Sequence, residues 1–171
     1  MFKILFFVFL IALGAFIYSP YETSSRYAKA VRDHEGSTLA ALTDHVAYRN
    51  SLKESLRPFL AEYLRTHATP TQTKLDVAKT AALFETHLDL QLTSDKIEKM
   101  LEGTRTNTSQ SNYAIVKTGW RSPFVFTALD NQSETKLIFE MHGFDGWKLT
   151  KIEASEQTLR AEFIRQLRLI R

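Results

Sequence analysis

The sequence predicts an α+β protein with an N-terminal transmembrane helix, a helical first half, a four-stranded antiparallel sheet and a C-terminal helix. Three observations predict this fold class. An unbroken apolar run, Ile4–Tyr18, opens the chain. Apolar residues then recur at the three- and four-residue spacing of helices as far as residue 103. From residue 113 onward, β-branched and aromatic residues dominate, as is typical of strands.

The apolar run follows a single basic residue and ends at Ser19-Pro20, so residues 1–19 are predicted to be a membrane anchor or a signal. At about 1.5 Å per residue the run covers roughly 22 Å, less than the roughly 30 Å hydrocarbon core. Cleavage after Gly14 would leave a very short apolar core, and cleavage after Ser19 would place a large residue where a small one is needed. We therefore favour an uncleaved anchor that enters the membrane through residues 4–18.

Bacterial export signals share this short basic start and apolar core. The expected location is therefore the bacterial inner membrane, with a single pass and the domain facing the periplasm. The alternative is secretion to the periplasm after signal cleavage. Basic residues flank the run on both sides, so they do not fix the orientation.

The remaining residues, 20–171, have the size of one compact domain. We divide it into a helical half (20–103), a polar linker (104–112) and a β half with a closing helix (113–171). The net charge of +3 comes from 22 basic and 19 acidic side chains that are interspersed. Because no basic stripe is present, nucleic acid is not an expected partner.

In the helical half, Pro20 is expected in the first turn of a helix over Tyr21–Glu35, with Gly36 as its C-terminal cap. Ser37 or Thr38 is placed to cap a short second helix.

A third helix is predicted to start at Asp44. Pro58 removes a backbone donor, so a kink or break is expected near Leu56 or Arg57. The helical pattern resumes over Asp76–Leu90. A capping box, Asp95 with Glu98, then predicts a further short helix that ends at Gly103.

In the β half, strands are predicted at Tyr113–Thr118, Phe124–Leu129, Thr135–His142 and Trp147–Glu153. Leu149 and Ile152 fall on opposite faces of the last strand, which requires a bulge or burial of both faces. Ser155 is expected to cap the closing helix, whose apolar stripe is Leu159, Phe163, Leu167 and Ile170. That stripe favours packing against the sheet over binding to a membrane surface.

Two groups of residues are candidates for ligand binding. Arg49 and Lys53 lie four apart on one helix face and could hold an anionic group, while Asp44 caps the helix start. The simpler interpretation is a capped helix with a solvated basic edge.

The second group is aromatic. Tyr113, Trp120 and Trp147 lie in or beside predicted strands and could line a hydrophobic cup on the sheet. Aromatic residues at such positions more often belong to the core.

Several stretches of the chain match the pattern of one known family. They are Ser19-Pro20-Tyr21, Tyr27-Ala28-Lys29-Ala30-Val31, Leu39, Leu42, Asp44, Val46, Arg49 and Ser51-Leu52-Lys53, and later Gly119-Trp120-Arg121-Ser122, Phe124, Leu137-Ile138-Phe139 and Gly146-Trp147-Lys148-Leu149-Thr150-Lys151-Ile152. With them the chain resembles the bacterial family called domain of unknown function 2939. One departure is His45-Val46-Ala47, where that family tends to have Phe-Pro-Ala. The resemblance implies an envelope protein and no particular activity. A helix pair before a curved antiparallel sheet is also similar to the nuclear transport factor 2-like cone.

The leading functional hypothesis is a non-enzymatic envelope module that binds a partner protein or an apolar ligand between helices and sheet. No zinc-binding His-Glu-x-x-His or Gly-x-Ser-x-Gly elbow is present in the sequence, so no catalytic residue, metal or cofactor is expected. One alternative is a small hydrolase or lyase with its site in the cavity between helices and sheet. Another is a structural scaffold without a ligand.

Overall fold

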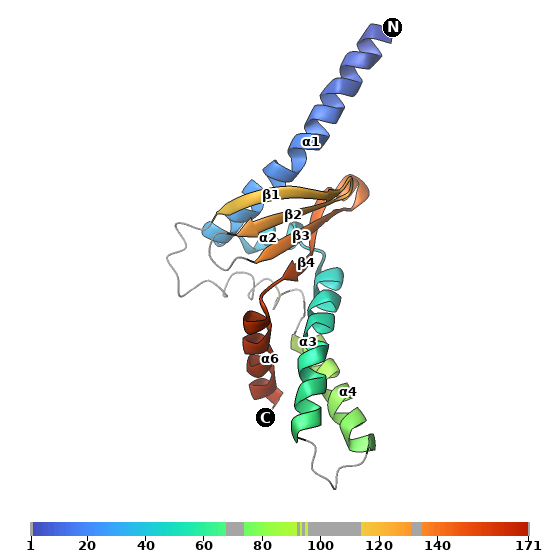
Figure 1. The fold of residues 1–171 in the computed structure, drawn as a ribbon. Coiled ribbons are helices and arrows are strands. Elements are labelled where there is room, and N and C mark those ends of the chain that lie inside the picture. Colours follow the sequence, from blue (N-terminus) through green and yellow to red (C-terminus); the bar gives the residue numbers. More distant parts are fainter. Residues whose placement is uncertain are drawn as a thin grey trace.

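The computed structural model describes residues 2–67, 74–91, 93, 95, 114–130 and 135–170. The α+β class is confirmed. The helices are α1 (Phe2–Arg32), α2 (Gly36–Ala41), α3 (His45–His67), α4 (Lys74–Gln91), the 3-10 helix η2 (Gly143–Asp145) and α6 (Glu156–Ile170). The N-terminal half of α1 projects away from the sheet, and α3, α4 and α6 extend on the opposite side (Figure 1).

The strands are β1 (Ile115–Ser122), β2 (Val125–Asp130), β3 (Lys136–Met141) and β4 (Trp147–Glu153). They form one antiparallel sheet in the order β1-β2-β3-β4, as predicted. β4 has its predicted bounds, whereas β1 continues four residues beyond its predicted end at Thr118.

The helix α1 is long and apolar enough to cross a membrane. Its most apolar stretch has a mean hydropathy of 2.1, and only 6% of that stretch is buried. A helix that is apolar all round and packs so little against protein suits lipid rather than a protein core. Its composition fits a membrane anchor or a signal sequence.

The same helix runs through Pro20 without interruption, so the prediction of a separate helix starting at Tyr21 is wrong. Pro20 has no N–H for the carbonyl of Phe16, one turn earlier. The Ser19 hydroxyl donates to that carbonyl instead, at 2.7 Å. Ser19 Oγ in turn accepts a hydrogen bond from Trp147 Nε1 at 2.8 Å. The helix stays continuous because a neighbouring side chain, fixed by the sheet, replaces the missing donor.

The C-terminal cap of α1 also differs from the prediction. His34, not Gly36, adopts the left-handed conformation, with φ of 57°. The N–H of Glu35 donates to the carbonyl of Ala30 at 2.9 Å, as in a Schellman motif. Gly36 instead opens α2. The strain of about 1–2 kcal/mol at His34 is small enough for the packing of the two helices to outweigh it.

The helix α3 likewise continues through Pro58, and the predicted break is absent. The missing N–H would have met the carbonyl of Glu54. Both residues are exposed, so water can reach that carbonyl. On the other face Leu56 and Leu60 are buried in the core and hold both sides of the proline in one helix.

The bulge predicted in β4 is confirmed. Leu137 pairs with Ile152 and Phe139 pairs with Leu149, so Thr150 is one residue in excess on β4. This extra residue brings Leu149 and Ile152 to the same face of the sheet, and both pack in the core.

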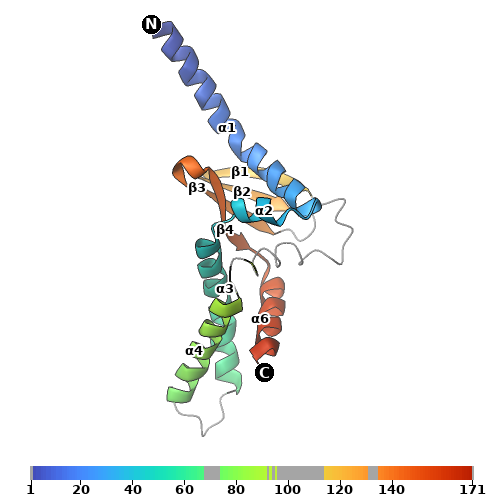
Figure 2. The same cartoon turned by 180° about the vertical axis from the view of Figure 1, so that it is seen from behind.

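The C-terminal half of α1 and α2 lie against the face of the sheet seen in Figure 2. There, the Tyr27 ring meets the edge of Phe139 at 5.6 Å between centroids, and Phe139 stacks on Phe126 at 4.8 Å. The core continues through α3 and α4 to Phe163 of α6. The helix predicted after Asp95, apart from that residue, and the linker predicted at 104–112 lie outside the described residues.

Candidate functional site

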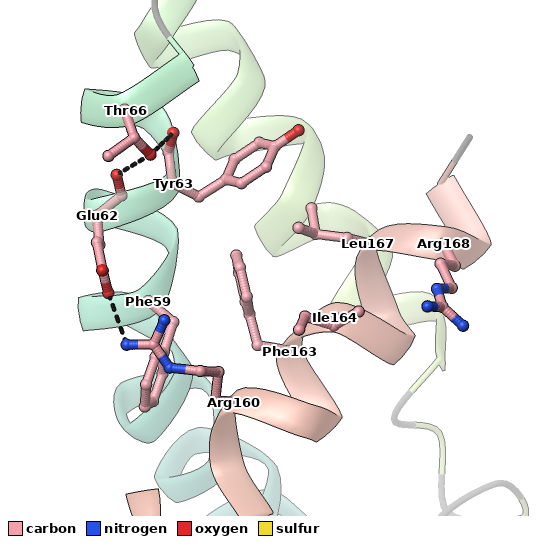
Figure 3. Close-up of a pocket in the computed structure, with 9 residues that line it drawn as sticks. All are labelled: Phe59, Glu62, Tyr63, Thr66, Arg160, Phe163, Ile164, Leu167 and Arg168. Atoms are coloured by element: carbon pink, nitrogen blue, oxygen red, sulfur yellow. Dashed lines mark hydrogen bonds and ion pairs between the residues drawn. The ribbon is translucent and has the colours of Figure 1, made fainter. Parts of the chain in front are cut away.

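A pocket of about 360 Å³ opens between α3 and α6, on the side of the sheet away from the N-terminal half of α1 (Figures 1 and 3). Its walls are mainly apolar. The lining residues are Phe59, Glu62, Tyr63 and Thr66 of α3, and Arg160, Phe163, Ile164, Leu167 and Arg168 of α6.

The two helices build the pocket in the same way. Each contributes residues at i, i+3, i+4 and i+7, counted from Phe59 on α3 and from Arg160 on α6. Side chains at these spacings share one helix face, so two such faces set against each other enclose a channel. Ser155 fixes the residue at which α6 begins, because its Oγ accepts a hydrogen bond from the N–H of Thr158 at 3.2 Å. This cap was predicted from the sequence.

Phe163 forms the inner wall of the pocket and is only 4% exposed. Its ring centroid lies 6.2 Å from that of Phe59, 6.1 Å from that of Tyr63 and 5.4 Å from that of Phe84 on α4. In Figure 3 its ring points from α6 into the space between Tyr63 and Phe59. Three helices therefore hold this wall in place.

Charged groups at the pocket are paired or turned away. Arg160 donates to Glu62 at 3.2 Å, and its guanidinium carbon lies 5.6 Å from the centre of the Phe59 ring. A second carboxylate, that of Glu156, is 3.6 Å from Arg160. Arg168 points away from the space between Tyr63 and Phe163 (Figure 3). The interior of the pocket is thus suited to an apolar group, with an ion pair at its edge.

Arg49 and Lys53 do share one face of α3, and Asp89 of α4 lies against both. Lys53 Nζ is 2.5 Å and Arg49 Nε 3.8 Å from Asp89 Oδ1. The hydrogen bond from Lys53 is the main cause that lowers the pKa of the Asp89 carboxyl, and the charges of Lys53 and Arg49 add to it. The position predicted for an anionic ligand is therefore occupied by a carboxylate of the chain itself.

Asp44 belongs to a different part of the surface. Its Oδ1 accepts the N–H groups of Val46 and Ala47 at 3.0 and 2.9 Å, which caps α3 as predicted. Its Oδ2 is 3.7 Å from Nδ1 of His142. Its own N–H donates to the carbonyl of Leu149, so the start of α3 is tied to β4.

The structure brings two of the aromatic candidates together. The rings of Trp120 and Trp147 meet edge to face at 5.6 Å between centroids, and Phe16 of α1 lies 5.5 Å from Trp120 and 6.2 Å from Trp147. Trp147 is buried, whereas 39% of Trp120 is exposed. Tyr113 lies outside the described residues. The cup predicted on the sheet is therefore filled by a residue of α1.

The pocket itself was missed by sequence reasoning. The stripe of α6 that contains Phe163 and Leu167 was predicted, and Phe59 and Tyr63 have the same four-residue spacing on α3. The missing information was that α3 and α6 face each other. A sequence signal did exist in Glu62 and Arg160, which have opposite charges: Glu62 lies three residues after Phe59, and Arg160 lies three residues before Phe163.

The fold and the site define an α+β domain that follows a long apolar helix and has an apolar pocket between two of its own helices. A family model described as protein of unknown function (DUF2939) matches residues 9–100. This match covers more than half of the chain, which therefore belongs to that family. Comparison with curated proteins gives no match, and comparison with solved structures gives none either. The match includes the α3 wall of the pocket and ends before the sheet and α6, so the resemblance noted for residues 119–152 stays a prediction.

Proposed function

We propose that this chain is a membrane-anchored, non-enzymatic binding protein whose pocket between α3 and α6 takes an apolar ligand. The observation that carries the proposal is the pocket itself. Its volume of about 360 Å³ falls within the usual range of roughly 300–1,000 Å³ for ligand pockets. Aromatic and aliphatic walls with few polar groups are also typical of such sites.

The paired charges favour binding over catalysis. General acid–base chemistry needs a group that can gain or lose a proton next to the substrate. The carboxylate that lines this pocket, Glu62, accepts a hydrogen bond from Arg160 at 3.2 Å. Both the binding hypothesis and the hydrolase or lyase alternative placed the site between helices and sheet, whereas this pocket lies between two helices. Within the described part of the chain, no particular contact supports the hydrolase or lyase alternative.

Contacts of the anchor with the domain favour an uncleaved N-terminus. Phe16 packs on Trp120 and Trp147, and Ser19 accepts the indole N–H of Trp147. Cleavage after Ser19 would remove Phe16 and Ser19, both of which contact side chains of the sheet. We therefore propose a single-pass protein of a bacterial inner membrane, with the domain on the periplasmic side. Intact mass of the purified chain tests retention of residues 1–19, and protease accessibility in spheroplasts tests the orientation.

Photolabelling of the full chain in lipid nanodiscs tests the pocket. The probe is an uncharged long-chain alcohol that carries a diazirine, and mass spectrometry maps the labelled residues. We expect labelling of α1, which reports dissolved probe in lipid, and of pocket residues such as Tyr63 and Leu167. The variant Ile164→Trp, which adds bulk at the pocket, should lose the pocket labels and keep those on α1.

The matched control is Leu83→Trp, because Leu83 is also exposed and apolar but lies on α4 and does not line the pocket. The Leu83→Trp variant should be photolabelled at the same residues as the natural chain. Labelling confined to α1 in all three proteins would contradict a ligand site and favour the scaffold hypothesis.

A further inference from the structure

We propose that the end of the sheet next to α1 rests on the membrane surface, through an aromatic rim that consists of Trp120, Phe124 and Phe144. The expected partner of the rim is the boundary between lipid headgroups and acyl chains. This inference rests on the proposed retention of α1 in the membrane, and it is independent of the pocket between α3 and α6.

Two turns bring the rim together at one end of the sheet. The β1–β2 turn follows the pair Ser122 and Val125, and the β3–β4 connection follows the pair Met141 and Trp147. These turns are adjacent because the N–H of Met141 donates to the carbonyl of Phe124 at 2.9 Å. In Figures 1 and 2 the N-terminal half of α1 leans over this same end of the sheet.

Contacts with Phe16 place the rim at the level where α1 leaves the apolar run. Phe16 lies in the last turn of the run and touches Trp120. Tyr18 and Tyr21 follow on the helix, both at least half exposed, with their rings stacked at 6.3 Å. Tyrosine and tryptophan are enriched where a membrane helix crosses the interface, because their rings are apolar and their N–H or O–H groups reach water. The rim continues this belt from the helix onto the sheet.

The exposure of the rim is difficult to explain in water alone. Phe124 is 62% and Phe144 112% exposed, so the second ring extends fully from the surface. Its backbone belongs to an ordered turn, since Phe144 lies in η2 between Gly143 and Gly146, whose φ angles are 57° and 76°. The N–H of His142 also donates to the carbonyl of Gly146 at 2.8 Å, closing the loop. A phenyl ring held outward by a closed loop fits insertion into an adjacent apolar phase.

The position of the rim favours lipid over a protein partner. Leu83 and Leu90 of α4 are as exposed as Phe124, but they lie on the opposite side of the sheet from the N-terminal half of α1 (Figure 1). The rim, in contrast, lies next to the segment that is proposed to enter the bilayer (Figure 1). Anchoring by α1 therefore brings these rings to the lipid surface without a further partner.

The absence of cysteine from the sequence makes a site-specific test direct. The variants Phe124→Cys and Phe144→Cys each carry one nitrobenzoxadiazole label in the full chain, reconstituted into vesicles of phosphatidylethanolamine and phosphatidylglycerol. Leu83→Cys is the exposed apolar control, and Leu10→Cys marks the anchor. Each label is challenged with lipids that bear a nitroxide near the headgroup or deep in the acyl chain, and with iodide in the water.

We expect labels at 124 and 144 to be quenched by the shallow nitroxide several-fold more strongly than the label at 83, and less by iodide. The label at 10 should respond to the deep nitroxide. If labels at 124 and 144 behave like the label at 83 while the label at 10 is deep, the anchor stands and the rim proposal is overturned. Protection from iodide without nitroxide quenching would indicate a protein partner and overturn it too. A label at 10 that is open to iodide would overturn both the anchor and the rim.

Discussion

Replacing Ser19 with alanine should destabilise the folded chain by about 2 kcal/mol, because two hydrogen bonds depend on one hydroxyl. Trp147 is only 4% exposed, so an indole N–H left without an acceptor costs about 1–3 kcal/mol. The carbonyl of Phe16 loses its donor as well, but it is partly accessible and contributes less. For a chain of this size, 2 kcal/mol corresponds to a fall in Tm of about 4–8 °C. Circular dichroism of the full chain in detergent micelles measures it.

Two control variants separate the contributions. Ser24→Ala removes a hydroxyl of the same helix that donates to the carbonyl of Pro20 at 2.7 Å and accepts a long hydrogen bond from Thr118 Oγ1 at 3.4 Å, and it leaves Trp147 paired. We expect a clearly smaller effect. In a Pro20→Ala background the new backbone N–H can reach Phe16, so Ser19→Ala should cost less than in the natural chain. If Ser19→Ala and Ser24→Ala change Tm equally, the bond between Ser19 and Trp147 does not stabilise the junction, and the reasoning is refuted.

Four further variants test separate features by chemical or thermal unfolding. The hydrogen bond from Lys53 lowers the folded-state pKa of Asp89, so its stabilising effect is present above the unfolded pKa of about 3.9 and is lost as the pH falls through the folded value. Asp89→Asn should thus be less stable than the natural chain at neutral pH and low salt, and equally stable at low pH. A constant difference at all pH values would contradict this. Phe163→Ala should cost about 3–5 kcal/mol, since it removes the shared wall of the pocket and leaves a cavity. Gly146→Ala should cost about 1–3 kcal/mol through backbone strain alone, because a Cβ there meets no atom within 4 Å. His34→Gly should stabilise the chain by up to about 1 kcal/mol, because glycine adopts the left-handed φ without strain. Destabilisation would mean that contacts of the imidazole stabilise the fold by more than the backbone strain costs.

Local patterns predicted the parts of this fold that depend on local chemistry. The out-of-phase positions of Leu149 and Ile152 indicated a bulge, and the residue in excess is Thr150. Ser155 caps α6 because a hydroxyl before a helical stripe can accept the N–H of Thr158 wherever the helix packs. Such features were predictable because cause and effect lie within a few residues of each other.

The helix start predicted after Pro20 and the break predicted near Pro58 were wrong for one physical reason. Whether proline breaks a helix depends on what happens to the carbonyl that loses its donor. At Pro20 the replacement involves Ser19 and, 128 positions away from it, Trp147. At Pro58 the affected carbonyl belongs to Glu54, an exposed residue that water can reach. Neither circumstance is visible in the local sequence.

The candidate anion site shows the same limit. The spacing of Arg49 and Lys53 correctly placed both on one face of α3. Asp89, whose carboxylate lies against both cations, comes from α4 and is 36 positions beyond Lys53. Spacing within a helix can predict which charges lie together, but not which counter-charge another helix supplies.

The proposed anchor, rim and pocket are connected through packed helices and strands rather than through a flexible linker. Trp147, at the start of β4, packs against Phe16 of α1, and its indole N–H donates a hydrogen bond to Ser19 of the same helix. Two residues along the same strand, Leu149 exchanges hydrogen bonds with the segment that starts α3, its N–H donating to Leu42 at 2.7 Å. α3 then carries one wall of the pocket. Because β4 joins α1 to α3 directly, the proposed insertion of α1 and the proposed contact of the rim with lipid would together set the direction in which the pocket faces. The pocket would then be held at a fixed distance from the membrane surface and would open toward the aqueous side.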